Sequence, residues 1–600
     1  MNRFLSLNEL TLTQPFDTLI GLLLLVSIIL FGNILSKKIN FHESEVLNTI
    51  IISCLIIIFI SFTFSFITLI EFNRELIRYL IWFLITAIFF YSVITKNIKI
   101  KKIDLNENFI FLFIFFLLAL IPATDADSLD YHLGFPLDIL RNGQFIIRDE
   151  WFHSKLSGLG EYLILFGLSA GSKNFGKIIN YFGLFIIFAS IRYLAIKYNS
   201  KFTYQYFIFS TPLIVWLTAS QKLSLFSSSL ICLVLVFIST GEIIRNKKVI
   251  SFSIICLIFC VLVKISNLIP ALIIFLYLSY MTIQQKNFYN LFKTVFFSLL
   301  LLVLPYFLRN YYLIGDIYYP VFEYFKETKD LEFLEFYKSL TLKVTSFYEL
   351  EFKDYFLIPL YYTLPLNVLR PTILLGLGAI LLYPVLFKIK FFINKFEFLF
   401  IFFIMFYIIL IPSVQPRYFL EAYWSLLILI IKYDVLRTYG SKFILSVSII
   451  LRAQSYFIFL CVLIALIYIL PGSFNEKYYK NVMKENAYNY NLINWIYENV
   501  PENALVVSDA VRSHSLYKNN FISREGFFRK KDLIKESLKL KISHFILDEN
   551  NKKDNIVELI NACGNKESSK LFSYKDEVRN RFSKLKNIKK TVILYENKCL

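Results

Sequence analysis

An acidic loop directly follows an apolar segment in the first quarter of the chain. Asp125, Asp127 and Asp130 lie in this loop, and Tyr131 and His132 come immediately afterwards. A carboxylate can accept a proton from a hydroxyl group or ligate a divalent cation. Because carboxylates are costly to hold beside hydrocarbon, such a cluster is by default a functional site. The loop therefore predicts a site at the mouth of a membrane helix.

Two later stretches could supply positive charge to the same site. Arg309 opens a long polar loop after an apolar run, and Arg417 and Tyr418 stand at the start of another run. Arginine binds phosphate oxygens through two parallel hydrogen bonds. Acid on one side and arginine on the other suit a hydroxyl nucleophile and a lipid phosphate that leaves.

The composition of the chain indicates the kind of secondary structure that positions these residues. The chain has 600 residues, of which 57% are hydrophobic, and its mean hydropathy is +0.59. Many apolar runs reach the roughly 20 residues that a helix needs to cross a bilayer. We therefore expect a polytopic helical membrane protein. The apolar segments are expected at 16–35, 46–70, 76–95, 108–122, 175–196, 202–219, 223–240, 249–264, 267–283, 291–308, 371–388, 397–412, 417–432 and 454–470.

Charge in the loops predicts the orientation of these helices. The net charge of +19 does not indicate a nucleic-acid partner, because the basic residues gather in short loops between apolar runs. Such loops face the cytoplasm. The segment 157–171 is apolar but short and carries Glu161. If it is a helix lying at the outer interface, every basic loop stays inside, with about 14 crossings and both termini outside. The basic loops are Lys96–Lys102, Arg245–Lys248, Lys388–Lys395 and Lys432–Lys442.

Three parts of the chain follow from this topology. Residues 1–105 hold extra amino-terminal membrane helices, and residues 106–470 form the core, with external loops at 123–175 and 309–353. In the polar tail, 471–600, short strand-like runs alternate with helical stretches, which predicts a small extracytoplasmic α/β domain. Cys563 and Cys599 could pair there if the tail lies in an oxidising compartment.

Several motifs give the chain, from about Phe109 to Tyr595, a resemblance to a known family. The motifs are Asp127 with Tyr131 and Gly143, the segment 156–167, Arg309-Asn310 with Gly315-Asp316 and Tyr319-Pro320, and Arg417-Tyr418. In this order the chain resembles the GT-C glycosyltransferases, which use sugars linked to polyprenyl phosphate and include protein O-mannosyltransferases and the aminoarabinose transferase of lipid A. The resemblance implies a GT-C-like membrane core.

The resemblance also implies roles for individual residues. Asp127 would be the base or the carboxylate that positions the acceptor. Asp125 and Asp130 would support Asp127 or help to hold a divalent metal ion, with Asp125 and Asp127 as its ligands. Arg417 and Lys264 would bind the lipid phosphate.

One departure from the family pattern leaves the mechanism open. Relatives often carry a second aspartate where this chain has Gln221 and Lys222. Either Lys222 binds phosphate directly, or the chemistry differs, or the alignment slips. Tyr131, His132, Arg309 and Tyr418 are further substrate-binding candidates. His132 could instead be an interfacial hydrogen-bonding residue, and the arginines could be anchors whose charged ends reach the headgroups.

These observations predict a glycosyltransferase of the cytoplasmic membrane whose active site faces the exterior. Its partners would be the bilayer, a polyprenyl-phosphate-linked sugar as donor, and a glycan, lipid or protein as acceptor. Two other functions remain open, a ligase or polymerase of polysaccharide and a secondary transporter or flippase. The sequence has neither the internal repeats nor the mid-membrane charges that are typical of a transporter.

Overall fold

The computed structural model is the basis of the description that follows. It describes residues 10–95, 107–148, 151–155, 158–284, 288–317, 374–388, 420–501, 504–508, 532–549, 554–580 and 583–600, with short pieces at 319, 357, 359–364, 403, 416–418, 514–516, 521–522 and 527.

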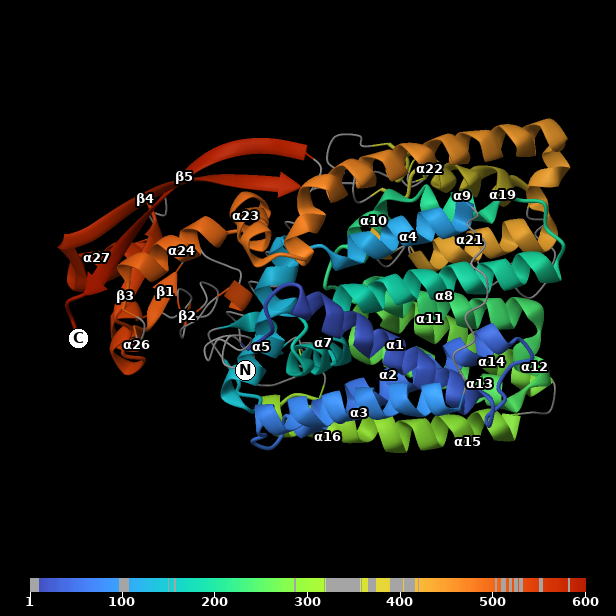
Figure 1. Cartoon of the computed structure of the whole chain (residues 1–600), viewed down its shortest axis with the longest axis horizontal. Helices are drawn as coiled ribbons and strands as arrows, with labels where there is room; N and C mark the ends of the chain where they lie inside the picture. Colours follow the sequence, from blue (N-terminus) through green and yellow to red (C-terminus); the bar gives the residue numbers. More distant parts are fainter. Residues whose placement is uncertain are drawn as a thin grey trace.

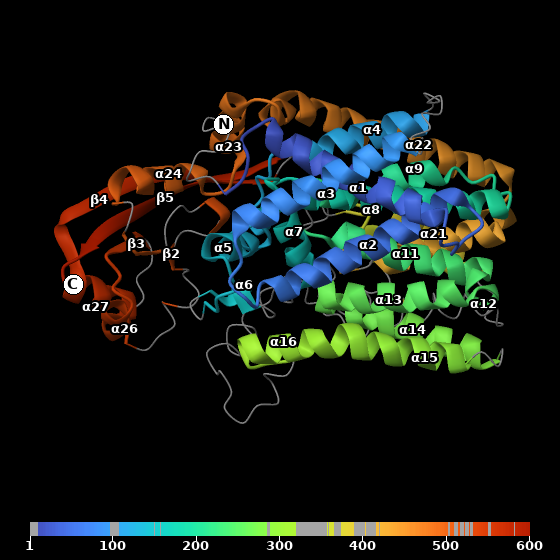
Figure 2. The ribbon, with the colours of Figure 1, turned by 60° about the horizontal axis from the view of Figure 1, so that its bottom comes forward.

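Long helices form a bundle, and a sheet lies beyond one end of it (Figure 1). The helices α15 and α16 run along one edge of the bundle (Figure 2). The bundle contains α1 (Phe16–Ser36), α2 (Glu45–Ile67), α3 (Arg74–Ile94), α4 (Glu107–Leu120), α7 (Leu159–Ala170), α8 (Phe175–Lys197), α9 (Tyr204–Phe209), α10 (Pro212–Thr218), α11 (Ser224–Thr240), α13 (Lys247–Val263), α14 (Leu268–Gln284), α15 (Phe288–Ser298), α16 (Leu304–Ile314), α19 (Leu382–Lys388), α21 (Leu420–Tyr433) and α22 (Ser441–Ile469).

The apolar helices make this a multi-pass membrane protein. Within the described ranges, seven helices are long and apolar enough to cross a bilayer, and shorter apolar helices accompany them. The predicted number of about 14 crossings is not confirmed. The predicted span at 397–412 falls, except for Phe403, outside the described residues.

Four chain segments meet at one end of the bundle, which we call the site end. Asp17, at the start of α1, accepts hydrogen bonds from the backbone N–H groups of Lys173 (2.7 Å) and Asn174 (3.4 Å), just before α8. The carbonyl oxygen of Leu120, which ends α4, accepts from the side chains of Asn174 (3.1 Å) and Ser473 (2.8 Å), the latter just after α22. The loop that carries Asp127 and the carboxyl-terminal sheet therefore lie at the same end.

The apolar segment predicted at 202–219 is divided into two short helices. α9 stops at Phe209, and α10 restarts at Pro212, because proline supplies no N–H and fits the first turn of a helix. Gln454 of α22 donates to the carbonyl of Ser210 (2.7 Å), and the N–H of Leu213 donates to the carbonyl of Leu374 (2.9 Å). Non-helical backbone at membrane depth is tolerated only when its polar groups are satisfied inside the protein. These two bonds meet that requirement.

The helix α7 corrects one prediction. We expected the segment 157–171 to lie at the outer interface, yet every residue of α7 is buried. Apart from Glu161 and Ser169 its residues are mainly apolar, and the burial of every one of them is typical of a helix enclosed by protein rather than of an interfacial one. The structure leaves no room for a Cβ at Gly158, which lies against the carbonyls of Leu262 and Val263 at the end of α13. The helix therefore lies at the site end but inside the protein.

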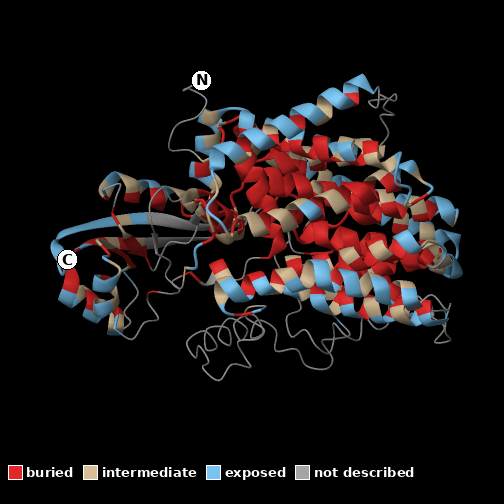
Figure 3. Cartoon of the chain, turned by 90° about the horizontal axis from the view of Figure 1, so that it is seen from below, coloured by how far each residue is buried: buried red, intermediate tan, exposed pale blue. Residues whose placement is uncertain are grey.

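The hydrophobic core runs along the middle of the bundle, and the outer faces of the peripheral helices are exposed (Figure 3). α8 and α11 lie in the core, and every residue of α11 is buried. Exposed Phe83, Phe90 and Leu84 on α3 are instead typical of a helix that faces lipid. The central helices therefore carry the loops of the site end on a rigid support.

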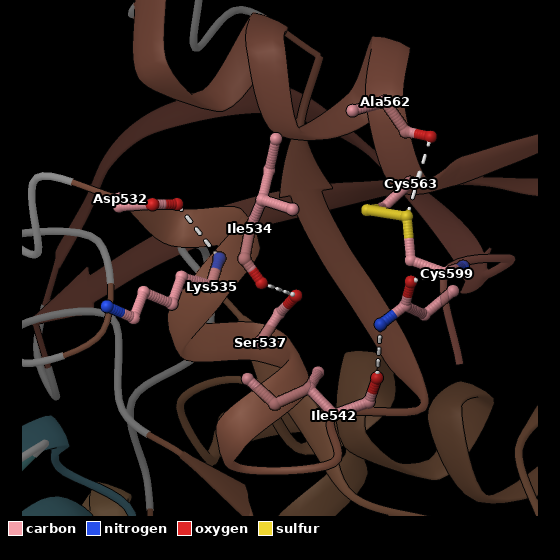
Figure 4. Close-up of a disulfide and its surroundings, with 9 residues drawn as sticks. Asp532, Ile534, Lys535, Ser537, Ile542, Ala562, Cys563 and Cys599 are labelled. Atoms are coloured by element: carbon pink, nitrogen blue, oxygen red, sulfur yellow. Dashed lines mark hydrogen bonds between the residues drawn. A yellow bond between two sulfur atoms is a disulfide. The ribbon is translucent and has the colours of Figure 1, made fainter.

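The tail forms a mixed five-stranded sheet in the order β2-β1-β3-β5-β4. β1 pairs with β2 and β3 in parallel, and β5 pairs with β3 and β4 in antiparallel fashion. Cys563 and Cys599 form a disulfide beside this sheet (Figure 4). The tail elements are α23 (Glu476–Asn486), α24 (Tyr490–Asn499), β1 (Val506–Ser508), β2 (Phe521–Ile522), α26 (Leu533–Lys539), β3 (His544–Asp548), α27 (Asp554–Cys563), β4 (Gly564–Asn580) and β5 (Ser583–Asn597).

Candidate functional site

The acidic loop is folded by its own short side chains. Asp125 accepts a hydrogen bond from the backbone N–H of Ser128 (3.0 Å). Its carboxylate therefore caps η1 (Ser128–His132), a single turn of π-helix. The next helix, α5 (Gly134–Asn142), ends at Gly143, whose φ of 69° is left-handed and favours glycine. Asp125 therefore shapes the loop that presents Asp127.

A second turn, residues 220–222 between α10 and α11, faces this loop. Asn180 of α8 donates to the carbonyls of Ser220 (2.9 Å) and Lys222 (2.8 Å). The backbone N–H of Gln221 donates to the hydroxyl of Ser128 (3.0 Å), which joins the turn to the acidic loop. The side chain of Asn180 thus fixes the position from which Lys222 extends.

Lys222 reaches the carboxylate of Asp127. Its Nζ lies 3.4 Å from Oδ2 of Asp127. The lysine side chain is only 7% exposed and lies under the ring of Trp216, whereas the side chain of Asp127 is 45% exposed. The pair therefore holds a buried cation behind a carboxylate that is open to solvent.

The charges around Asp127 favour its ionised form. Partial burial of the carboxyl raises its pKa, but the positive charges of Lys222 and Arg417, together with those that His132 and His153 carry only when protonated, outweigh this effect and hold the pKa well below its usual value. Arg417 precedes α21 in the sequence, so its influence means that the late arginine and the early acidic loop share one site. Asp127 consequently stays a carboxylate at neutral pH.

A layer of aromatic and acidic groups lies beside this pair. The ring of Tyr131 stacks on that of His153, with centroids 4.6 Å apart and planes within 5°. Nδ1 of His153 lies 4.0 Å from a carboxylate oxygen of the buried Asp130. Nδ1 of His132 lies 2.9 Å from Oε1 of Glu161. Asp130 and Tyr131 therefore contribute to the wall of the site.

Arg309 has a different environment from the predicted one. Its guanidinium is buried and donates to the carbonyl of Ser65 (2.6 Å), to the hydroxyls of Thr68 (3.3 Å) and Tyr162, and to the side chain of Asn310 (2.9 Å). These bonds tie α16 to α2 and α7. These contacts give Arg309 a structural role in joining the helices, in place of the predicted role in binding substrate.

The remaining candidates occupy less defined positions. Lys264 caps the end of α13 at the site end and is half-buried. The backbone of Tyr418 lies in the short helix η8 (Pro416–Tyr418). Among the described residues, no three His, Cys, Asp or Glu side chains form a group that could hold a metal ion. The sequence leaves open whether a metal ion binds, with Asp125 and Asp127 as its ligands if one does, and they are not part of such a group within the described residues.

Sequence reasoning missed two residues that build the site. In the sequence, Glu161 stands out only as an acid within an apolar segment, and that lone charge is a usable signal for a buried polar contact. Asn180 stands alone among apolar residues of α8, which is a similar but weaker signal. Neither pattern predicts which residue the side chain contacts, because each contact joins two segments that are distant in the sequence.

Comparison with known proteins places the chain in a family. A family model described as the DUF1420 N-terminal domain matches residues 91–483. The chain belongs to the DUF1420 family. The matched range of this DUF1420 protein includes Asp127, Lys222 and Arg417 and excludes the sheet of the tail. No curated protein sequence matches the chain.

The chain is also similar to two solved structures. The crystal structure of ArnT from Cupriavidus metallidurans bound to undecaprenyl phosphate has a TM-score of 0.46 and 11% identity, covering 81% of the DUF1420 chain and 96% of ArnT. ArnT in the apo state gives a TM-score of 0.44 and 12% identity, covering 80% and 96%. Likeness at this level does not define the activity of the DUF1420 protein.

Proposed function

We propose that this DUF1420 protein is a membrane glycosyltransferase of the GT-C type. It would move a sugar from a polyprenyl-phosphate donor to a hydroxyl acceptor, which is a lipid, a glycan or a protein. The observation that supports this most is the pairing of Asp127 with Lys222, beside Arg417, at one end of an apolar helix bundle. The motifs around these residues resemble that family.

The chemistry follows from the charges. A donor lipid lies in the bilayer with its phosphate at the bundle end, where Lys222 and Arg417 supply positive charge. The acceptor oxygen attacks the anomeric carbon, and the bond between that carbon and the phosphate oxygen breaks. The departing phosphate gains negative charge, and fixed cations stabilise such a leaving group strongly in a site shielded from water. Asp127 holds the acceptor or the sugar from the solvent side.

The same end faces the outside of the cytoplasmic membrane in this proposal. Cys563 and Cys599 pair in the tail at that end, and stable disulfides form mainly in oxidising compartments. The basic loop Arg245–Lys248 lies at the opposite end of α11 and α13, as expected for cytoplasmic loops. The disulfide and the basic loop both support the outward orientation that the proposal requires.

The test uses membranes with and without the protein and undecaprenyl-phosphate sugars that are radiolabelled in the sugar. Undecaprenyl phosphate is the lipid named for ArnT, and a panel of hexoses and pentoses covers the unknown sugar. We expect label to move to a product that no longer carries the undecaprenyl chain. Movement of intact donor across vesicles would instead support a flippase, and a ladder of growing glycan would support a polymerase.

A further inference from the structure

The side chains of His132 and Glu161 form a buried pair that the proposed function does not yet use. His132 closes the turn η1, and Glu161 lies in the first turn of α7. Nδ1 of His132 and Oε1 of Glu161 are 2.9 Å apart, and both side chains are largely buried, at 8% and 12% exposure. The second oxygen of Glu161 accepts from the N–H of Gly158 (2.9 Å). Hydrogen bonds therefore hold both oxygens of the Glu161 carboxylate in place.

This arrangement decides which nitrogen of the ring carries the proton. An ionised carboxylate only accepts hydrogen bonds, so Nδ1 of His132 must be the donor. In the neutral ring, Nε2 then carries the lone pair. This Nε2 is buried and has no hydrogen-bond partner within the described residues. The contact with Glu161 thus selects the tautomer whose Nε2 can accept a proton.

The pair lies beside the acidic site. His132 follows Asp127 by five residues in the same loop, and the ring of His132 lies 4.1 Å from that of Tyr131, centroid to centroid. Asp127 itself is a poor base, because its neighbours hold its pKa well below the usual value and a weakly basic carboxylate takes a proton from a hydroxyl reluctantly. A neutral imidazole suits that task better at neutral pH.

We propose that His132 is the general base of this transferase and that Glu161 is the positioning residue that fixes its tautomer. The proposal rests on the proposed function. The acceptor O–H gives its proton to Nε2 as its oxygen bonds to the anomeric carbon. The electron pair of the broken bond leaves with the polyprenyl phosphate, and His132 later releases the proton to water. Asp127 remains ionised and holds the reactants.

The decisive variant is His132→Asn, because asparagine keeps an N–H donor near the position of Nδ1 and has nothing at Nε2. We expect transfer from the labelled undecaprenyl-phosphate sugar to fall about 100-fold or more. Binding of undecaprenyl phosphate and the thermal unfolding temperature should stay near those of the wild type. His544→Asn, in β3 of the tail, is the matched control and should transfer normally.

A second measurement does not depend on folding of that variant. Nitrogen NMR of the wild-type protein, labelled at histidine, should show His132 protonated at Nδ1 in its neutral form. Glu161→Gln should increase the other tautomer and lower kcat with little change in KM, because Gln can donate to the ring.

The outcomes separate the two proposals. Normal transfer by His132→Asn, or a wild-type ring protonated at Nε2, would overturn the role of His132 and leave the proposed function in place. Absence of transfer by the wild type with every donor would overturn the proposed function, and with it this inference.

Discussion

Lys222 and Asp127 lie 95 positions apart in sequence, yet Nζ of one is 3.4 Å from Oδ2 of the other. The lysine is buried and the aspartate is open to solvent, so a ligand that approaches from the site end meets the carboxylate first and the cation behind it. The carboxylate can accept a hydrogen bond from a hydroxyl group and the ammonium can bind a phosphate oxygen, so the pair supplies both kinds of group that the proposed sugar transfer uses.

Two neighbouring aspartates should behave differently when each is changed to asparagine. Asp127→Asn removes the charge that faces Lys222, and we expect transfer to fall about 100-fold. Asp125→Asn keeps an oxygen that can accept from the N–H of Ser128, so the turn is still capped and transfer should stay within a few-fold of the wild type. Initial rates with the labelled donor measure both. Equal losses would show that the assignment of the two acids is wrong.

The effect of Asp127→Asn should not depend on pH between about 5 and 8. The pKa of Asp127 is depressed, so its favourable contribution is present above the ordinary carboxyl pKa and is lost only as the pH falls through the lowered one. The test is the ratio of the wild-type transfer rate to the variant's transfer rate, measured at several pH values in this range. A ratio that shrinks between pH 7 and 5 would mean that Asp127 takes up a proton there.

Asp17 should matter for stability rather than for chemistry. It accepts from the hydroxyl of Ser172 (3.2 Å) and from the backbone of Lys173 (2.7 Å), and Gln14 donates to its other oxygen (2.9 Å). Asp17→Ala leaves these buried donors without an acceptor, which costs about 1–3 kcal/mol for each group. We expect a lower unfolding temperature in detergent, whereas the variant that remains folded binds undecaprenyl phosphate normally. Unchanged melting would contradict this role.

The disulfide gives a test of orientation. Without reductant, Cys563 and Cys599 should resist a thiol reagent that does not cross membranes, and both should react after reduction. Changing both to serine should destabilise the tail by about 2–4 kcal/mol, measured by limited proteolysis. Cys461→Ser, at a free and half-buried cysteine of α22, is the control and should leave the tail unchanged. Free thiols at 563 and 599 in intact cells would place the tail in the cytoplasm.

The general architecture could be read from the sequence because a bilayer leaves few choices. Apolar runs and basic loops indicate a helical membrane protein and place the loop of Asp127 at the end where α21 begins, next to Arg417. In the tail, β3 and α26 are a strand and a helix of the kinds that the alternating strand-like and helical runs predict. The local sequence patterns of these segments are strong, so their secondary structure depends little on tertiary contacts.

The remaining features depend on contacts that no local pattern specifies. α7 and an interfacial helix share the same apolar length, and only packing against α2 and α13 distinguishes them. The count of crossings depends on breaks such as Ser210–Thr211, where bonds from distant residues replace helical ones. Arg309 could reach solvent or protein equally well from its position in the chain. Its bond to Ser65 requires the assembled bundle.

The role of Lys222 can be measured most directly by equilibrium binding of undecaprenyl phosphate to the purified protein in lipid nanodiscs. Lys222→Met keeps the length of the side chain and removes its charge. Losing one charge-assisted contact to phosphate costs about 1.5–3 kcal/mol, which corresponds to roughly 10- to 150-fold weaker binding. Lys222→Arg should retain most of the affinity. Equal binding by the wild type and Lys222→Met would contradict the phosphate site on which the whole proposal depends.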